Sequence, residues 1–473
     1  MCDEKDEETK MGFFFVCSYE VVTAIVATAK RDFSIISDSE DLVNFVKERT
    51  LDKKFKIRKE ALTGLAMIYK TFLGDPDVPE TTKKAVTWIK DKILHGYYMT
   101  GLEDRLLVER LLNTCLVPYQ LAADVRMKKL YYLYATIDEN ATKSFIELQK
   151  SQATVRKAVA DLTEIYSQGL TADVRDKEIT SRVAQLSKYL PDPIKAAEFI
   201  HKFAMNLVHD ETMLRLLETI VNPEVSCKEC AEAGTQLLKK LGQPVMTNLY
   251  YNTVKLLMER ISSVLVDKDA IQHLVHYVEL CLRRDEGVAV EDIGIDVDSS
   301  GEKGLRLLFV LAFGFPAHFM TEQVLSRLLN ILSMDSQDHN VSAMVLCILT
   351  FVGKYRPLES QFPDIVNQLV PICERLATQG TTKQAKHAMR CLHVNVTNQE
   401  QVFIKILDAL KDNLTPASAH CRTSIVTLGH MALLLPERFT IPIKNIVSRK
   451  IVKVNTSWNS MDLFVDWSRT NFE

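Results

Sequence analysis

Apolar residues recur along this chain with the period of an α-helix, and the strict alternation typical of β-strands is nearly absent. In KKFKIRKEALTGLAMIYKTF (53–72), Ile57, Ala61, Leu65 and Ile68 fall at i, i+4, i+8 and i+11, so they form one apolar stripe. A helix with such a stripe is stable only when a neighbour covers it. The pattern therefore restricts the chain to a fold of packed helices.

The same periodicity continues through the rest of the chain. Met127, Leu130, Tyr131 and Tyr134 repeat it at i, i+3, i+4 and i+7. Short breakers such as LPDP (190–193) separate the predicted helices. With no βαβ alternation, the fold class is predicted to be all-α. Further amphipathic helices are predicted over residues 20–30, 41–49, 105–112, 195–208, 254–266, 323–332, 341–354 and 424–435.

The segment DKKFKIRKEALTGL (52–65) has the pattern of the second helix of a HEAT repeat. An acidic residue precedes the helix, Ile-Arg opens it, and a small Ala lets a neighbouring helix approach closely. Weaker copies begin near 125–126, 340–341, 384–386 and 420–422. The last three are about 45 and 36 residues apart, near the HEAT period of ~40–47 residues. The chain is therefore predicted to form one continuous α-solenoid of right-handed, irregular HEAT repeats rather than three globular domains.

One segment breaks the helical rhythm. DEGVAVEDIGIDVD (285–298) contains six acidic residues, no basic residue and two glycines, and Ser-Ser-Gly follows it. A helix here would stack like charges, so residues 285–301 are predicted to form a solvated acidic loop. The simplest interpretation of this loop is a solubilising insertion.

Composition excludes several classes of protein. Hydrophobic residues make up 47% of the 473 residues, and Gly (16) and Pro (14) are few, so a collagen-like or broadly disordered chain is excluded. No apolar run reaches the ~18 residues of a membrane span. The ten cysteines show no framework spacing, which is typical of reduced thiols inside the cell. The net charge of −3 means that nucleic-acid binding would need a local basic patch.

The sequence contains no motif that predicts catalysis. It has no Gly-rich phosphate loop, no G-x-S-x-G, no H-E-x-x-H and no set of kinase motifs. Cys227-x-x-Cys230 lacks the second pair or the two histidines that a zinc site needs, since His209 stands alone. His430 lies in an apolar helix and is expected to be a core residue. We therefore expect neither an enzyme nor a metal site.

The distribution of charge along the chain gives a more specific functional prediction than the motifs do. KERTLDKKFKIRK (47–59) contains seven basic and two acidic residues, a local net charge of +5. A smaller basic cluster opens a later helix, and successive helices of a solenoid line a common groove, so the two clusters could converge on one polyanion. A solvated surface explains the same charges equally well. The candidate residues are Lys53, Lys54, Lys56, Arg58, Lys59, Arg126, Lys128 and Lys129.

Seven strings in this sequence together resemble the cohesin-associated family called "precocious dissociation of sisters". The resemblance covers roughly residues 19–452, and segments 1–18 and 453–473 do not match it. Family members are longer, so the resemblance implies the central portion of such a protein, either truncated or from an incomplete gene model. The strings are LVNFVKERTLDKKFKIRKEALTGLAMIYK (42–70), WIKDKILHGYY (88–98), DRLLVERLL (104–112), MKKLYYLYATID (127–138), LPDP (190–193), TTKQAKHAMRCLH (381–393) and TLGHMALLLPERF (427–439).

The resemblance implies a non-catalytic HEAT-repeat scaffold in the nucleus, associated with chromatin. Such a protein binds the kleisin subunit of cohesin and regulates sister chromatid cohesion, both its maintenance and its release. The wings apart-like releasing factor and sororin-type antagonists are further implied partners, although the family engages the releasing factor upstream of the resembling region. Contact with chromatin is expected to be indirect, and no membrane partner is implied.

The resemblance also implies a structural ligand. Members of the family bind inositol hexakisphosphate in a basic pocket of the solenoid, and no other cofactor is expected. We assign that role to the eight basic residues named above, because they lie within the resembling strings or, for Arg126, directly before one. The alternative to a cohesin regulator is a HEAT scaffold for transport or phosphatase assembly, which would bind peptides without depending on polyphosphate.

Overall fold

The computed structural model describes residues 19–31, 40–74, 80–99, 101–295, 297–334, 338–415 and 417–450. Within these ranges the chain forms helices joined by short turns, and no β-strand occurs. The prediction of an all-α HEAT-type fold is confirmed. The segments 1–18 and 453–473, predicted to lie outside the repeats, are also outside the described residues.

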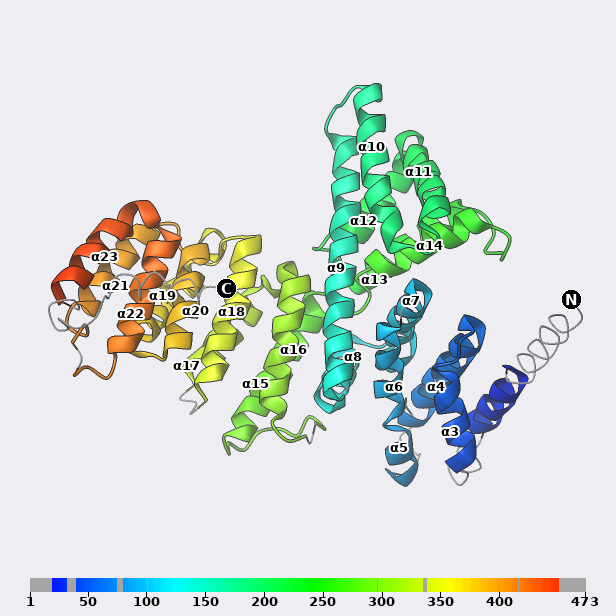
Figure 1. Cartoon of the computed structure of the whole chain (residues 1–473), viewed down its shortest axis with the longest axis horizontal. Helices are drawn as coiled ribbons and strands as arrows, with labels where there is room; N and C mark the ends of the chain where they lie inside the picture. Colours follow the sequence, from blue (N-terminus) through cyan, green and yellow to red (C-terminus); the bar gives the residue numbers. More distant parts are fainter. Residues whose placement is uncertain are drawn as a thin grey trace, which may run out of the picture. The chain divides into compact units, whose positions relative to one another are not determined.

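The chain divides into two compact units at His273–Leu274, inside helix α15 (Lys268–Asp285). Figure 1 labels the helices. Unit 1 contains a helix over 19–31, α3 (Glu40–Arg49), α4 (Phe55–Gly74), α5 (Glu80–Val86), α6 (Ile89–His95), α7 (Leu102–Leu111), α8 (Ala123–Thr136), α9 (Glu139–Ser167), α10 (Ala172–Leu186), α11 (Pro193–His209), α12 (Glu211–Val221), α13 (Cys227–Lys240) and α14 (Leu249–Ile261). Unit 2 contains α16 (Ser300–Gly314), α17 (Glu322–Ser333), α18 (His339–Tyr355), α19 (Pro363–Gln379), α20 (Thr382–Asn395), α21 (Gln399–Leu410), α22 (Cys421–Leu434) and α23 (Pro436–Lys450).

The pair α3 and α4 is the HEAT repeat predicted from residues 41–65. The two helices pack together, and α4 also packs on α5, α6 and α7. The carboxylate of Asp52 accepts the backbone N–H of Lys54 just before α4 begins, so it stabilises the turn that leads into the helix. The stripe predicted on α4 is buried, as is the stripe predicted on α8. Both assignments are confirmed.

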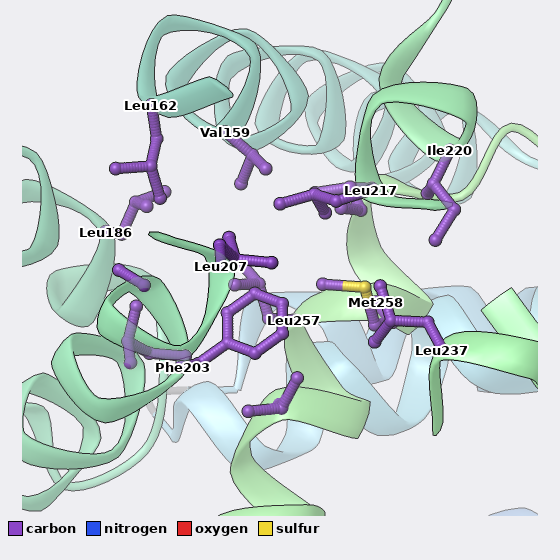
Figure 2. Packing of buried hydrophobic residues seen from close by; sticks show 14 of the residues in the cluster. Val159, Leu162, Leu186, Phe203, Leu207, Leu217, Ile220, Leu237, Leu257 and Met258 are labelled. Atoms are coloured by element: carbon purple, nitrogen blue, oxygen red, sulfur yellow. The ribbon is translucent and has the colours of Figure 1, made fainter. Parts of the chain in front are cut away.

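The second half of unit 1 packs around α9, which has 29 residues. α10, α12 and α14 all contact it, and α11 packs on α14. Figure 2 shows the resulting core, in which Val159 and Leu162 of α9 face Leu207 of α11, Leu217 of α12 and Leu257 of α14. These side chains are fully or almost fully buried. Burying each contributes about 1.5–3 kcal/mol, so this cluster holds the helices of the region together.

A buried ion pair joins α7, α9 and α14 of unit 1. The guanidinium of Arg260 donates from Nη2 and Nε to the carboxylate of Glu109, at 2.9 and 3.1 Å. Its Nη2 also donates to Ser151 Oγ at 2.8 Å, and Nη1 donates to the carbonyl of Tyr189 at 2.8 Å. The side chains of Arg260 and Glu109 are only 2% and 4% exposed. A charge at this depth is tolerated because hydrogen bonds satisfy it.

Unit 2 is built from two layers of helices, as a solenoid requires. One layer runs from α16 to α18, α20 and α22, each packed on the next, and the other runs from α17 to α19 and α21. Contacts between α17 and α18, α19 and α20, and α21 and α22 join the layers. The three HEAT-like copies predicted near 340, 384 and 420 open α18, α20 and α22. The predicted period therefore places them side by side in one layer.

Polar contacts recur at the spacing of one repeat. Arg58 bonds to Asp104, 46 residues away, and the side chain of Asn395 donates to the carbonyl of Leu349, also 46 residues away. Gln384 donates to Ser342 at a separation of 42 residues. Each bond links a helix to its equivalent in the next repeat, so the side chains that hold neighbouring repeats together lie one period apart.

Two predicted boundaries need correction. The acidic loop predicted over 285–301 occupies 286–299, because α15 continues to Asp285 and α16 begins at Ser300. It is not wholly solvated, since Ile293 and Ile295 are buried. The carboxylate of Asp285 accepts the N–H of Gly301 at 2.8 Å and so caps α16. The helix predicted over 254–266 is α14, which ends at Ile261.

Candidate functional site

Four of the predicted basic residues form an exposed group at the start of α4. Lys53, Lys54, Lys56 and Lys59 are all exposed. Lys53 and Lys54 precede the helix, and Lys56 and Lys59 lie in its first turns. The ammonium of Lys56 lies 4.4 Å from the ring centre of Tyr19. This group, which we call the α4 lysine group, presents four positive charges to solvent within about two helical turns.

Arg58 lies in the same stretch but points inward. Its Nε and Nη2 donate to the carboxylate of Asp104 at 2.8 and 2.7 Å, and Nη1 donates to the carbonyls of Asp52 and Lys53. The hydrogen bond to Asp104 raises the pKa of Arg58. Because Asp104 is fully buried at the start of α7, this bidentate contact fastens one repeat to the next.

The second predicted cluster lies at the start of α8, and its three members differ. Arg126 is 4% exposed and donates to the carbonyls of Leu265, Leu121 and Tyr119, at 2.9, 2.7 and 3.3 Å. Its guanidinium therefore ties the start of α8 to two loops. Lys128 is exposed, whereas Lys129 is half-buried, and that burial lowers the pKa of Lys129.

The structure does not bring the two clusters together. Lys129 lines a cavity of about 520 Å³ with Tyr69 and Lys70, which lie near the C-terminal end of α4. The α4 lysine group lies at the opposite end of the same helix. At 1.5 Å per residue, about 20 Å separates the two positions along the axis. One small polyanion cannot contact both, so the candidate polyphosphate residues fall into two separate sites.

Lys92 on α6 lies near Lys47, the first residue of the basic run 47–59, and a search for runs of basic residues does not find it. The ammonium of Lys47 lies 4.3 Å from the ring centre of Trp88. Burial, and then the positive charge of Lys47, lower the pKa of Lys92 on α6, so these two cations lie near each other. They are one repeat period apart in the sequence. Searching for basic residues separated by one period would have found the pair.

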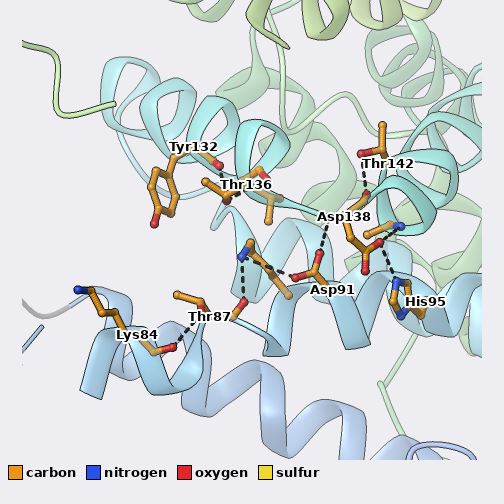
Figure 3. A network of polar contacts seen from close by, with 11 residues as sticks. Lys84, Thr87, Asp91, His95, Tyr132, Thr136, Asp138 and Thr142 are labelled. Atoms are coloured by element: carbon orange, nitrogen blue, oxygen red, sulfur yellow. Dashed lines mark hydrogen bonds and ion pairs between the residues drawn. The ribbon is translucent and has the colours of Figure 1, made fainter. Parts of the chain in front are cut away.

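A network of polar contacts ties α6 to the start of α9 (Figure 3). The backbone N–H of Asp138 donates to Asp91 at 2.8 Å, and Asp138 Oδ1 lies 3.0 Å from His95 Nε2. Burial acts to raise the pKa of Asp138, but its bonds from the N–H of Ala141 and from His95 outweigh that effect and lower it. The carboxylate is thus held ionised at the start of α9, where it caps the helix.

Cys227 and Cys230 lie buried in the first turn of α13. Burial raises the pKa of both thiols, and the nearby carboxylate of Asp267 raises that of Cys227 further. Thiols with raised pKa values are poor nucleophiles. His430 is buried, and burial lowers its pKa to about 4, as expected for a core histidine. Among the described residues, no three His, Cys, Asp or Glu side chains gather to hold a metal, and no helix has the length and apolarity to cross a membrane.

The chain has close relatives among known proteins. Residues 19–470 match the family model described as the sister chromatid cohesion protein PDS5, so the match extends beyond residue 452, where the expected resemblance ended. PDS5 homolog B of Gallus gallus and that of Homo sapiens are each 39% identical to it over 438 residues. PDS5 homolog A of Homo sapiens is 36% identical over the same length.

The similarity to solved structures is weaker. A chain from the Pds5–Scc1 complex has a TM-score of 0.49 and 16% identity, covering 59% of this chain and 40% of that one. Kap121p bound to Nup53p has a TM-score of 0.28 and 12% identity, covering 95% of this chain and 44% of Kap121p.

The sequence relatives decide the family, although this chain is much shorter than they are. The alignments cover 92% of this chain, but 30% of each homolog B and 32% of homolog A. The chain thus spans about a third of the length of the curated relatives it matches. Because the family model matches nearly all of residues 19–473, the chain belongs to the PDS5 family of sister chromatid cohesion proteins.

Proposed function

We propose that this chain is a non-catalytic scaffold that binds the kleisin subunit of cohesin and so regulates sister chromatid cohesion, both its maintenance and its release. The observation that carries the proposal is the family match over residues 19–470, with relatives named for sister chromatid cohesion at 36–39% identity. Stacked helix pairs offer long surfaces for a partner segment, which suits this role.

The same proposal places the chain at chromatin in the nucleus, where sister chromatids are held together. The wings apart-like releasing factor and sororin-type antagonists belong to the proposed assembly as regulators, and contact with DNA is indirect. The alternative of a transport or phosphatase scaffold has less support, because the family match names cohesion.

The first prediction tests the kleisin partner. Purified chain is expected to bind a fragment of the cohesin kleisin with a Kd of about 1 μM or tighter, which corresponds to ~8 kcal/mol of binding free energy. Isothermal titration calorimetry measures this, with an unrelated acidic protein as a charge control. Circular dichroism first shows that the purified chain is helical, as expected for this fold. If the folded chain binds the kleisin fragment no more tightly than it binds the unrelated acidic protein, the cohesin proposal is wrong.

We also propose that the α4 lysine group binds inositol hexakisphosphate as a structural ligand. Four exposed lysines repel one another, and a polyphosphate would relieve that repulsion while bridging the start of α4 to neighbouring elements. Arg58 would support the group from behind without using its guanidinium, which is already bonded to Asp104. The three residues at the start of α8 lie too far away to share the same molecule.

The second prediction compares two single charge reversals. Inositol hexakisphosphate at ~100 times its Kd is expected to add about 2.7 kcal/mol to the free energy of unfolding of the wild-type chain. Lys54→Glu is expected to abolish the rise in Tm, whereas Lys128→Glu, which changes an exposed lysine of the other cluster, is expected to keep it. Thermal melts with and without the ligand measure this, and inorganic phosphate controls for charge alone.

Each outcome of these melts has a clear meaning. A shift that Lys128→Glu removes and Lys54→Glu keeps would move the site to the other end of α4. If the protein melts cooperatively and the ligand does not change its Tm, the α4 lysine group is ordinary solvated surface. Arg58→Glu and Arg126→Glu are unsuitable tests, because both side chains hold the fold together.

A further inference from the structure

Three neighbouring helices of unit 2 contain no acidic residue. These are α18, α20 and α22, with 17, 14 and 14 residues, and they lie side by side in one layer. The whole chain contains 61 acidic residues, so this gap is unusual. We call the surface made by these helices and the C-terminal half of α16 the acid-free face. Its helices carry the basic residues Lys354, Lys383, Lys386, Arg390 and Arg422.

The other layer of unit 2 has the ordinary mixture of charges. α17, α19 and α21 carry Glu322, Asp364, Glu374, Glu400 and Asp408 alongside their basic residues. Two cations of this layer form ion pairs. Arg327 Nη1 lies 2.7 Å from a carboxylate oxygen of Glu279, and Lys405 Nζ lies 2.6 Å from one of Glu374. The absence of acids is therefore specific to one layer and not a property of the whole unit.

A cavity opens on the acid-free face. Its volume is about 500 Å³, and all four helices of the layer contribute to its walls. Phe309 comes from α16, Phe351 and Lys354 from α18, Arg390 from α20 and Leu433 from α22. The lining of the cavity therefore combines apolar and aromatic side chains with cationic ones.

The apolar part of this surface is unusually exposed. Phe309 and Phe313 are 36% and 49% exposed, and Leu433 is 51% exposed. The rings of Phe309 and Phe313 pack on Phe351, with centroids 5.4 and 5.7 Å apart, so the three form one aromatic cluster. Clustered exposed apolar side chains beside a cavity are a feature of binding surfaces.

The cations beside this cluster have no acidic partner in the described part of the chain. Lys354, Lys383, Lys386 and Arg390 form no ion pair with any described carboxylate. Lys354 Nζ lies 6.0 Å from the ring centre of Phe351. Burial, and then the charges of Arg390, Lys386 and Lys383, lower the pKa of His387 to about 4. His387 is thus neutral near pH 7, and the lysines and Arg390 supply the positive charge of the surface.

We propose that the acid-free face is a docking surface for an acidic, amphipathic helical segment of a partner protein. The aromatic cluster and Leu433 would bury the apolar stripe of that segment, and its carboxylates would pair with Lys354, Lys386 and Arg390. A groove between stacked helices, with apolar anchors at its centre and charges at its rim, is the usual geometry for such recognition.

Charge complementarity and apolar area together favour this occupant over others. A nucleic acid would use the cations but would need a longer run of phosphate contacts than four side chains provide. A small polyphosphate would leave Phe309, Phe313 and Leu433 exposed to water. Only a ligand with both carboxylates and apolar anchors uses both halves of the surface.

The test uses the full chain and a synthetic peptide. The peptide has about 18 residues, or five helical turns, with Leu and Phe at i, i+3, i+4 and i+7 and glutamates on both flanks. A matched peptide has Gln in place of each Glu, and another has Ala in place of each Leu and Phe. Fluorescence anisotropy of the labelled peptides measures binding at two salt concentrations, and a DNA duplex of similar charge is titrated in parallel.

Two variants of the chain test the positive charge and the apolar contacts of the acid-free face separately. Lys386→Glu with Arg390→Glu reverses the charge, and Phe309→Ala removes an aromatic anchor. The matched control is Lys405→Glu with Lys444→Glu, which makes the same change in net charge at exposed positions of other helices. Circular dichroism and thermal melts verify that every variant remains folded.

The expected result is binding of the acidic peptide by the wild-type chain and by the control variant, with affinity about tenfold lower at high salt. Each variant of the acid-free face, and each substituted peptide, is expected to weaken binding by about tenfold or more.

The proposal is overturned if the wild-type chain does not bind the acidic peptide at about 1 mM. It is also overturned if the control variant weakens binding as much as the charge reversal, or if the DNA duplex binds this face more tightly than the peptide. The peptides are designed and do not come from kleisin. This result therefore does not depend on whether the chain binds kleisin.

Discussion

Arg260→Met is expected to lower the free energy of unfolding by about 3–5 kcal/mol, because it leaves the carboxylate of Glu109 buried without its partner. The guanidinium makes four hydrogen bonds, two to Glu109, one to Ser151 and one to the carbonyl of Tyr189. Methionine fills much of the same volume but replaces none of these bonds. Of its hydrogen bonds to described side chains, Glu109 would keep the one from Gln152.

The same two helices provide a matched control. Arg110 on α7 pairs with Glu259 on α14 at 2.7 Å, but these side chains are 38% and 32% exposed. Water screens and solvates them, so Arg110→Met is expected to cost less than about 1 kcal/mol. Urea unfolding followed by circular dichroism measures both variants. If the two substitutions lower the free energy of unfolding equally, burial of the pair between Arg260 and Glu109 does not make its loss more costly.

The loss caused by Arg260→Met should also depend on pH. Burial raises the pKa of Glu109, and the charge and hydrogen bonds of Arg260 oppose that effect. Without Arg260, the pKa of Glu109 in the folded state rises further above its value of ~4.3 in the unfolded chain. The folded variant then favours the protonated carboxyl, so its deficit relative to wild type is largest near pH 7 and shrinks as the pH falls toward the unfolded value. A deficit that stays constant over this range would contradict the explanation.

Much of the fold could be predicted from the sequence, because helical stripes and repeat spacing are local or periodic signals. The burial of Ile57 and Leu65 follows from their spacing alone, and α18, α20 and α22 begin where the predicted repeats begin. The division of the chain at His273 and the large contact region of α9 could not be predicted. Both depend on which helices pack together at long range, and amphipathic patterns do not specify that.

The candidate site was less predictable, because a run of basic residues does not show where each side chain points. Lys54 and Arg58 are one helical turn apart, yet one is exposed and the other is bonded to Asp104 in the next repeat. Arg126 is part of a basic run and is nevertheless buried against three backbone carbonyls. A cation's partner can lie one period or more away in the sequence, so composition within a window misses it. Comparing acidic content between alternate helices would have revealed the acid-free face.

The other large effect is expected in unit 2, from adding a single methyl group to α18. A Cβ at Gly353 would overlap with Oδ1 of Asn395 on α20 and would lie 2.7 Å from its Cγ. Asn395 cannot move aside easily, because it is fully buried and its amide donates to the carbonyls of Leu349 and Cys391. It also accepts the N–H of Leu358. The absence of a side chain at Gly353 is therefore what allows α18 and α20 to approach each other here.

Gly353→Ala is expected to lower the free energy of unfolding by about 2–4 kcal/mol, from overpacking and from polar groups of Asn395 left unsatisfied. The gain of up to ~1 kcal/mol from placing Ala in a helix offsets only part of this loss. Gly314→Ala on the neighbouring α16 is the matched control, because a Cβ there meets no atom within 4 Å, and it is expected to be neutral or slightly stabilising. Urea midpoints measure both, and hydrogen exchange of peptides from α18 and α20 locates the effect. If the contact with Asn395 causes the loss, the effects of the two substitutions are not additive. Gly353→Ala should then lower the free energy of unfolding only slightly in a chain that already carries Asn395→Ala. If the cost is unchanged in that background, the contact between Gly353 and Asn395 is not its source.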